Sequence, residues 1–361
     1  MKKWKIGLVG CGDIAWGSYL AEMHRVPKAD VVAVCDIIPE RAKEYAAAYN
    51  VPNWYGSVDE MLEKCDFEIL MDVASIQSHH EINMKALKAG KHLYSQKPIG
   101  LTVAEVNEQI AAAKEANVRF SASPIHMLRP EIKNIKKMVK KGAIGKVTMI
   151  RARASHGGPE YFQYRTADPT WFHRPGAGAL YDLGVHALHQ VTGILGPAKL
   201  VGCMAAITEP ERLARSGTYD GMKIRADEIP DNYLITMDFG GGALGIVDTG
   251  YVQRDSKMPS LEVYGTLGVI TLSTVGGWKS QIDVYFDSPE RGVRGWMTPM
   301  PQERPEPQFF QCWAVGELIE AIEGDRPSRL TPEHARHVID IICTIPEAIN
   351  TGRILPVNST F

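Results

Sequence analysis

The feature that most constrains the fold is a glycine-rich turn between a short apolar run and a helical pattern near the start of the chain. The apolar run KIGLVG covers residues 5–10, and the turn GCGDIA covers residues 10–15. A second apolar run, VVAVC, follows at residues 31–35 and leads directly into Asp36. Two apolar runs separated by a helical segment predict a β-α-β unit. Glycines in the first turn and an acidic residue after the second strand are typical of a dinucleotide-binding fold.

Each position of this turn has a physical task in such a fold. Gly10 allows a tight turn, and Gly12 lets the backbone approach a pyrophosphate. Asp13 and Ile14 then open the helix whose N-terminus would receive the phosphate oxygens. A carboxylate at Asp36 accepts a hydrogen bond from a ribose 2′-hydroxyl and repels a 2′-phosphate, so we expect NAD rather than NADP. The alternative is a purely structural glycine turn that binds no ligand.

The alternation of strands and helices continues to about residue 125 and then stops. Up to that point it predicts a Rossmann-type, doubly wound parallel sheet in a domain of residues 1–125. Beyond it, six strand-like runs follow one another between residues 147 and 274. Consecutive strands predict an α+β C-terminal domain, residues 126–361, with a large and mostly antiparallel sheet. We read the proline-rich stretch 287–308 as a long excursion and expect helices near 309–324 and 332–349.

Composition narrows the possible partners. The net charge of −2 provides no positive field for nucleic acid, and no apolar stretch approaches the roughly 18 residues that a membrane span requires. Six cysteines without a CxxC pair favour reduced thiols and a cytoplasmic protein, and the first residues lack the pattern of a secretion signal. The apolar strands of the second domain favour a homo-oligomer in which a partner covers part of the sheet.

Two further segments carry groups suited to acid–base chemistry. Lys97, in QKP, follows the fifth predicted strand and would face the crevice at the carboxyl ends of the strands, although a lysine on a surface is often only solvated. If residues 180–193 form a helix, then Asp182, His186 and His189 recur on one face. A carboxylate beside an imidazole can orient the ring as it takes a proton, but a structural pair is equally compatible with this spacing. We expect no metal, because tetrahedral zinc would need further ligands.

Taken together, these motifs resemble the glucose–fructose oxidoreductase, inositol dehydrogenase and MocA (Gfo/Idh/MocA) family. The resemblance covers nearly the whole chain. It rests on the turn at residues 10–15, HHEINMKALKAGKHLYSQKP at 79–98, GAIGKV at 142–147, the glycine-rich segment that ends at His186, and the C-terminal helices.

This resemblance implies that Lys97, Asp182 and His186 meet at the nicotinamide. His186 would remove a hydroxyl proton while hydride leaves the same carbon, Lys97 would stabilise the developing oxyanion, and Asp182 would hold the histidine or a substrate hydroxyl. It also places Ser75, His79 and Gln96 among the residues near the cofactor.

Two positions depart from the family pattern. Gln96 replaces a glutamate that usually precedes the lysine, and His189 stands where many members have aspartate. A sugar ring would suit the aromatic and polar groups of 155–161 and 171–174, which include His156, Tyr161 and Trp171, although loop aromatics also serve packing.

The sequence therefore predicts an NAD-dependent oxidoreductase. The resemblance implies that the substrate is a sugar, a glycoside or a cyclic polyol, in which a secondary hydroxyl is oxidised to a ketone. A branch of the family that oxidises glucosides implies C3 as the oxidised carbon in that case. Two alternatives stay open at this point: an NAD-assisted glycoside hydrolase with no net redox change, and a non-catalytic NAD-binding regulator.

Overall fold

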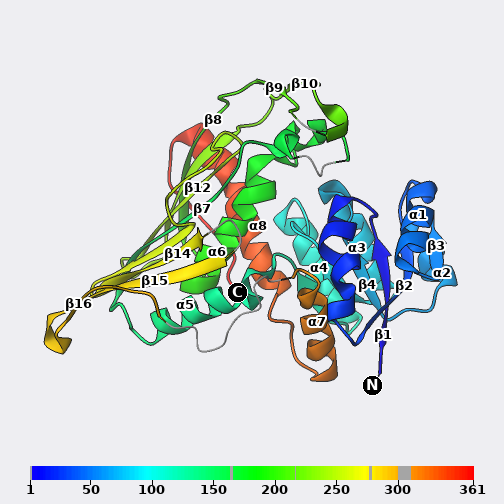
Figure 1. Ribbon diagram of the computed structural model, residues 1–361, viewed down its shortest axis with the longest axis horizontal. Helices are drawn as coiled ribbons and strands as arrows, with labels where there is room; N and C mark the ends of the chain where they lie inside the picture. Colours follow the sequence, from blue (N-terminus) through cyan, green and yellow to red (C-terminus); the bar gives the residue numbers. More distant parts are fainter. Residues whose placement is uncertain (1, 163–165, 216, 276–278, 300–309) are drawn as a thin grey trace. The chain divides into compact units, whose positions relative to one another are not determined.

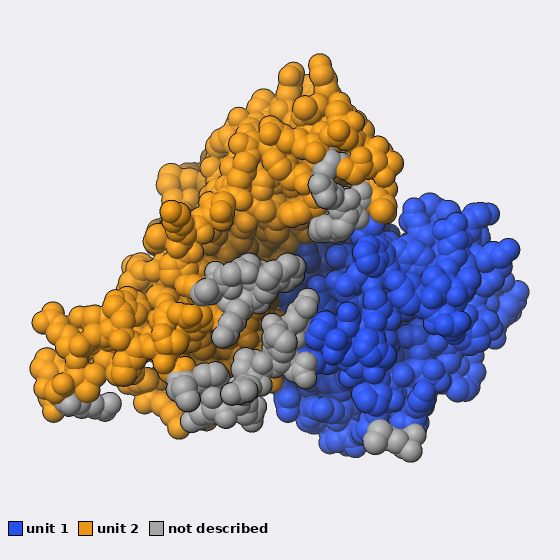
Figure 2. All heavy atoms as spheres, in the orientation of Figure 1, with its two compact units in different colours: residues 1–125, 310–339 blue, residues 126–309, 340–361 orange. Residues whose placement is uncertain are grey.

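A computed structural model describes the 361-residue chain except for residues 1, 163–165, 216, 276–278 and 300–309. The chain divides into two compact units, coloured separately in Figure 2. Unit 1 comprises residues 1–125 and 310–339, and unit 2 comprises residues 126–309 and 340–361. The segment 310–339, which was expected in the second domain, therefore packs within unit 1. The reason is that α7 (Trp313–Glu323) contacts two strands of the unit 1 sheet, β5 (His92–Ser95) and β6 (Phe120–Ala122).

Unit 1 contains a six-stranded parallel sheet with the order β3-β2-β1-β4-β5-β6 (Figure 1). This is the order of a doubly wound dinucleotide-binding fold, so the predicted fold class is confirmed. The strands are β1 (Trp4–Val9), β2 (Ala29–Cys35), β3 (Asn53–Tyr55), β4 (Ile69–Asp72), β5 (His92–Ser95) and β6 (Phe120–Ala122).

Local signals explain where the helices of unit 1 begin. Pro39 occupies the first turn of its helix, where a missing N–H costs nothing. The Ser57 hydroxyl accepts a hydrogen bond from the Glu60 backbone N–H, and Thr102 with Glu105 forms a reciprocal capping box. The helices are α1 (Pro39–Tyr49), α2 (Val58–Lys64), α3 (His79–Lys88) and α4 (Val103–Glu115).

The helical segment after the glycine turn is irregular. It consists of a π-turn, η1 (Ala15–Tyr19), followed by a 3₁₀ segment, η2 (Leu20–Arg25). The pattern of apolar residues predicted a helix here, and periodicity alone does not distinguish these tighter and wider turns from a regular α-helix.

Unit 2 is built on a nine-stranded sheet with the order β16-β15-β14-β13-β7-β12-β11-β8-β17. Only the β7–β12 pair is parallel among its described strands, so the prediction of a large, mostly antiparallel sheet is confirmed. The strands are β7 (Val147–Ser155), β8 (Leu200–Ala206), β11 (Asn232–Asp238), β12 (Leu244–Gly250), β13 (Leu261–Gly265), β14 (Gly268–Val275), β15 (Lys279–Ser288), β16 (Val293–Met297) and β17 (Leu355–Pro356).

Helices cover one face of this sheet. α6 (Val185–Leu195) contacts β7 and β12, and α5 (Pro130–Lys140) contacts β15 (Figure 1). The covered face is apolar: Ile150, Val247 and Ile235 are each fully buried there. The last helix, α8, runs from Pro332 to Thr351.

Two strand pairs differ from the sequence-based expectation. The stretch 287–308 was predicted as an excursion, but β15 and β16 form a hairpin that extends the sheet edge, and residues 300–309 lie outside the described part. The sequence pattern did not indicate β16, because its five residues, VRGWM, lie among prolines and charged residues. A second hairpin, β9 (Glu211–Leu213) with β10 (Lys223–Arg225), was not predicted. In the described chain, no helix combines the length and hydropathy needed to cross a membrane.

Candidate cofactor site and catalytic groups

The glycine turn of unit 1 has the shape that a dinucleotide requires. Gly10 has a φ of 95°, and a Cβ there would lie 2.6 Å from the backbone N and Cα of Ala74. Any larger residue would therefore push β1 away from the loop after β4. At Gly12, by contrast, a Cβ would meet nothing within 4 Å. The backbone at Gly12 is thus open to a close ligand, which fits the predicted pyrophosphate position.

Asp36 lies at the carboxyl end of β2, next to this turn. Its Oδ2 accepts a hydrogen bond from the Cys11 N–H at 2.8 Å, and its Oδ1 accepts one from the Ile38 N–H at 2.9 Å. Arg41 contributes an Nη1 at 3.7 Å from Oδ2. The carboxylate is therefore fixed beside Gly10–Gly12, where its remaining lone pairs suit ribose hydroxyls. Ile14 is partly exposed on the same turn and Ser75 is exposed in the loop after β4.

His79 connects two loops at the carboxyl edge of the sheet. Its Nδ1 lies 2.6 Å from the Pro98 carbonyl oxygen, and its Nε2 lies 3.1 Å from the Ala74 carbonyl oxygen. The neighbouring Asp72 is buried, which raises its pKa to about 6, and the nearby His79 acts against this shift. His79 thus holds the segment after Lys97 against the loop after β4.

Gln96 occupies the position before Lys97 and is buried in an uncharged network. Its amide nitrogen donates to the Tyr19 hydroxyl at 2.6 Å and to the Gln311 oxygen at 3.0 Å. Its oxygen accepts from the Lys97 N–H at 2.8 Å and from the Ser123 hydroxyl at 3.1 Å. All four contacts use the amide in one orientation. Gln96 therefore replaces the family's glutamate in a site whose hydrogen-bonding partners are all neutral groups of unit 1.

The segment that carries Asp182 and His186 is not one continuous α-helix. Residues Leu180–Gly184 form a π-turn, η7, and α6 starts at Val185. The condition of a helix over residues 180–193 therefore holds from Val185 onward, and the first turn is of the wider π type. A π-turn widens the spacing of side chains and is frequent at functional sites. It changes the i to i+4 relation on which the predicted common face depended.

Asp182 is held by an aromatic residue distant in sequence. The Tyr251 hydroxyl donates to Asp182 Oδ2 at 3.0 Å. The His156 ring stacks on the Tyr251 ring, with centroids 5.3 Å apart and an interplanar angle of 13°. The predicted substrate residue His156 thus lies on the same side-chain stack as the partner of Asp182.

His186 contacts a second histidine. Nε2 of His126 lies 2.9 Å from Nδ1 of His186. His126 lies in η4 (Ile125–Leu128), just beyond β6. His189, one turn further along α6, is buried.

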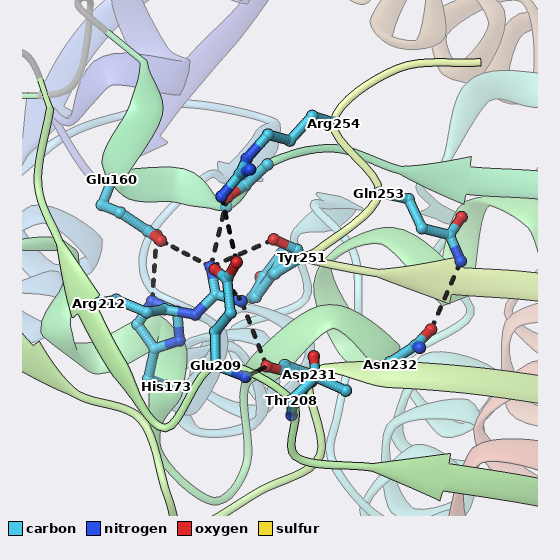
Figure 3. Close-up of polar contacts among 12 residues, drawn as sticks. Glu160, His173, Thr208, Glu209, Arg212, Asp231, Asn232, Tyr251, Gln253 and Arg254 are labelled. Atoms are coloured by element: carbon cyan, nitrogen blue, oxygen red, sulfur yellow. Dashed lines mark hydrogen bonds and ion pairs between the residues drawn. The ribbon is translucent and has the colours of Figure 1, made fainter.

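A buried ionic cluster supports the loop that contains His156 (Figure 3). Arg212 from β9 donates through Nη1 to Glu160 Oε1 at 2.7 Å and to the carbonyl oxygens of Gly157 and Tyr251 at 3.3 and 3.2 Å. Asp231 lies on its other side at 3.4 Å. Hydrogen bonds from His173 and Arg212 hold the pKa of Glu160 below its usual value despite burial. The cluster therefore fixes the backbone on both sides of the His156–Tyr251 stack.

The remaining predicted substrate residues have aromatic or cationic neighbours. Trp171 stacks on Phe172 with centroids 3.7 Å apart. Tyr161 has the guanidinium groups of Arg215 and Arg254 at 4.8 and 5.4 Å from its ring centroid. These contacts describe packing, so the substrate role of both aromatic residues stays a prediction. No group of three or more metal-ligating side chains occurs in the described part of the chain.

Three residues of these arrangements were missed in the sequence. His126 had a signal, because it follows the carboxyl end of a predicted parallel strand. Tyr251 and Arg212 had none, since their partners lie 69 and 52 residues away and meet them only through the sheet and the β9–β10 hairpin.

Comparison with known families decides the assignment. Residues 4–123 match the family model described as "Oxidoreductase family, NAD-binding Rossmann fold", and residues 132–271 match the Gfo/Idh/MocA C-terminal domain. The chain belongs to the Gfo/Idh/MocA family. The predicted family and enzyme class are confirmed, and NAD is the cofactor of this fold.

Curated relatives are similar to this chain over most of its length, and solved structures share its fold. A levoglucosan dehydrogenase from Pseudarthrobacter phenanthrenivorans is 26% identical over 82% of this chain and 80% of its own length. A myo-inositol 2-dehydrogenase from Thermotoga maritima is 25% identical over 75% of each chain. Among structures, an oxidoreductase domain protein from Kribbella flavida has a TM-score of 0.84 at 20% identity, covering 99% of this chain and all of its own. A levoglucosan dehydrogenase in complex with NADH has a TM-score of 0.81 at 20% identity, with the same coverage.

Proposed function

We propose that this family member is an NAD-dependent dehydrogenase that reversibly oxidises a secondary hydroxyl of a sugar, a glycoside or a cyclic polyol to a ketone. The observation that carries the proposal is the way unit 2 holds Asp182 and His186 on adjacent turns, each hydrogen-bonded to a ring of its own. A regulator without chemistry would not need two supported acid–base groups. The names of the relatives, which act on levoglucosan and on myo-inositol, support this substrate class.

Each proposed catalytic group has a defined task. His186 takes the hydroxyl proton at Nε2, since Nδ1 faces His126. Asp182, oriented by Tyr251, holds the substrate or the histidine, and the Lys97 ammonium stabilises negative charge on the substrate oxygen. Gly10, Gly12 and Asp36 hold NAD together with Asp13, Ile14, Ser75, His79 and Gln96. When bound, the nicotinamide supplies the hydride acceptor.

His156, Tyr161, Trp171 and His189 are proposed to line the substrate side. Their aromatic faces and ring nitrogens suit a hydroxylated ring. For a glucoside we propose C3 as the oxidised carbon.

The decisive experiment follows NADH formation from NAD with levoglucosan, myo-inositol, methyl glucosides and aryl C- and O-glucosides, with mass and NMR analysis of each product. NADH together with a ketone product supports the proposal. Release of an aglycone without NADH would replace it with the redox-neutral hydrolase, and NAD binding without any product would replace it with the regulator. A faster reaction with NADP than with NAD would contradict the role of Asp36.

Substitutions test the catalytic roles proposed for His186 and Lys97. His186→Ala and Lys97→Ala are each expected to lower kcat by roughly 100-fold or more while the Kd for NAD changes little. His80→Ala is the matched control, because His80 is partly exposed and pairs only with Glu108 among the contacts observed. Undiminished turnover by His186→Ala would overturn the mechanism.

We also propose that the chain forms a homo-oligomer through the helix-free face of the unit 2 sheet. Strand register places Met204 of β8 beside Leu234 of β11 on this face, and they are 69% and 40% exposed. Next to them Arg153 pairs with Asp248. A two-fold axis brings this surface against the same surface of a second copy. Apolar groups can then contact apolar groups, and charges of opposite sign can pair.

A further inference from the structure

His126 and His186 form a direct imidazole–imidazole hydrogen bond within unit 2. The two nitrogens are 2.9 Å apart, and the rings meet edge to face with centroids 5.1 Å apart and planes at 84°. His126 is only 9% exposed, and it projects from η4 toward the first turn of α6. This geometry belongs to a hydrogen bond along a ring edge and not to ring stacking.

Such a bond allows two proton arrangements. A neutral imidazole has one N–H and one lone pair, so one ring must donate and the other must accept. When His126 donates from Nε2, His186 carries its own proton on Nε2 and can give it to a substrate oxygen. When His186 donates from Nδ1, its Nε2 has a lone pair and can take a proton. The direction of the bond therefore selects whether His186 is an acid or a base.

We propose that His126 is the positioning residue and proton partner of His186, an inference that rests on the acid–base role proposed for His186. During oxidation the substrate O–H bond breaks and its proton binds His186 Nε2. The proton on His186 Nδ1 then moves along the existing hydrogen bond to Nε2 of His126. The pair gains one proton and one positive charge in total: His126 now carries both ring protons, and His186 is left neutral with its proton on Nε2. Reduction of a ketone follows the same path in reverse.

Gln190 adds an adaptable neighbour to this pair. It lies one helical turn after His186 on α6, and its amide nitrogen is 3.5 Å from Nδ1 of His126. Rotation of an amide exchanges its N–H₂ and C=O groups, so Gln190 can face either a protonated or an unprotonated His126 nitrogen. A fixed charge at this position would favour one arrangement and hinder the other.

The first test is independent of the substrate. Long-range ¹H–¹⁵N spectra of ¹⁵N-histidine-labelled full-length protein report the tautomer of each ring, and the His126 and His186 signals are assigned by their loss in His126→Phe and His186→Ala. We expect His126→Phe to shift both ring nitrogens of His186, because its Nδ1 loses its partner. The His80→Ala control should leave the His186 signals unchanged. Identical His186 nitrogen shifts in the wild type and in His126→Phe would overturn the proposal.

The second test separates a proton partner from a packing residue. With NAD and levoglucosan or myo-inositol, His126→Ala is expected to lower kcat by about 10- to 100-fold with little change in KM for NAD. Added imidazole, which can occupy the space left by the ring, should restore much of kcat. His126→Phe keeps most of the volume but offers no nitrogen, so imidazole should not rescue it.

The outcomes also distinguish this inference from the proposed function. Retained activity in His186→Ala would remove the proposed mechanism altogether. Loss of activity in His186→Ala, together with full activity of a folded His126→Phe, would leave the function intact and remove only the role of His126.

Discussion

At the scale of single residues, Gln96 stands where the family usually has glutamate, and its side-chain amide is matched to the uncharged groups around it. The Gln96 nitrogen donates to Tyr19 and to Gln311, and both partners are uncharged. In Gln96→Glu, an acceptor replaces this donor and a charge enters a site that is 8% exposed. We expect a loss of about 1–3 kcal/mol in unfolding free energy at neutral pH. Urea denaturation measures it, with the exposed Gln77→Glu as control; equal losses in the two variants would contradict the account.

Asp72 predicts a pH dependence of stability. Burial raises its pKa from 3.8 to about 6, against an opposing effect of His79. Between these pH values the folded chain keeps a proton that the unfolded chain releases. The free energy of unfolding therefore falls as the pH rises from 3.8 to about 6, and the contribution of Asp72 is most favourable below this range. The full effect amounts to roughly 3 kcal/mol.

Asp72→Asn removes this ionisation. The variant is therefore expected to lose less stability than the wild type between pH 4 and pH 6, as measured by thermal midpoints in a series of buffers. Asp66→Asn serves as the control, because Lys5 lowers the pKa of Asp66 and gives it the opposite sign. Parallel curves for Asp72→Asn and the wild type would show that Asp72 does not ionise in this range.

At the scale of elements, the sequence predicts features that depend on residues close together in the chain, such as helix starts and turns. Pro39 and Thr102 mark the helix starts of α1 and α4 because capping is local. The glycine turn and Lys97 were placed correctly relative to their strands for the same reason. The π-turn before α6 was not predictable, since it depends on how Gly184 fits against β12. Tyr251 reaches Asp182 only after β12 has paired with β7 and β11.

Gly184 allows this π-turn to approach the sheet. A Cβ at this position would lie 3.1 Å from Thr249 Cγ2 and 3.2 Å from Leu180 Cδ1. Gly184→Ala should therefore displace the turn that carries Asp182, costing roughly 1–3 kcal/mol of stability and lowering kcat more than it raises KM for NAD. The control is Gly316→Ala in α7, whose nearest atom is Val26 Cγ1 at 3.4 Å; there a helix former replaces glycine at ordinary contact distance. Equal kcat for Gly184→Ala and the wild type would contradict this constraint.

At the scale of the whole molecule, the helices in the described part of the chain cover only one face of the unit 2 sheet. Register alone shows which side chains lie there, because alternate residues of paired strands share a face. Leu234 lies between Met204 on β8 and Asp248 on β12. Met204 and Leu234 are exposed apolar side chains that lie side by side on this face, next to the Arg153–Asp248 pair, and adjacent exposed apolar groups favour an interaction site.

If a second copy covers this face, a charge at its apolar part should separate the subunits. Met204→Glu with Leu234→Glu places two like charges on neighbouring strands, and a two-fold contact repeats them on the partner. We expect the wild type to sediment as an oligomer and the double variant to sediment at the monomer mass, about 40 kDa, with an unchanged circular dichroism spectrum. Trp54→Glu, on the exposed strand β3 of the other sheet, should leave the oligomer intact. An oligomer that persists in the double variant would show that another surface joins the subunits.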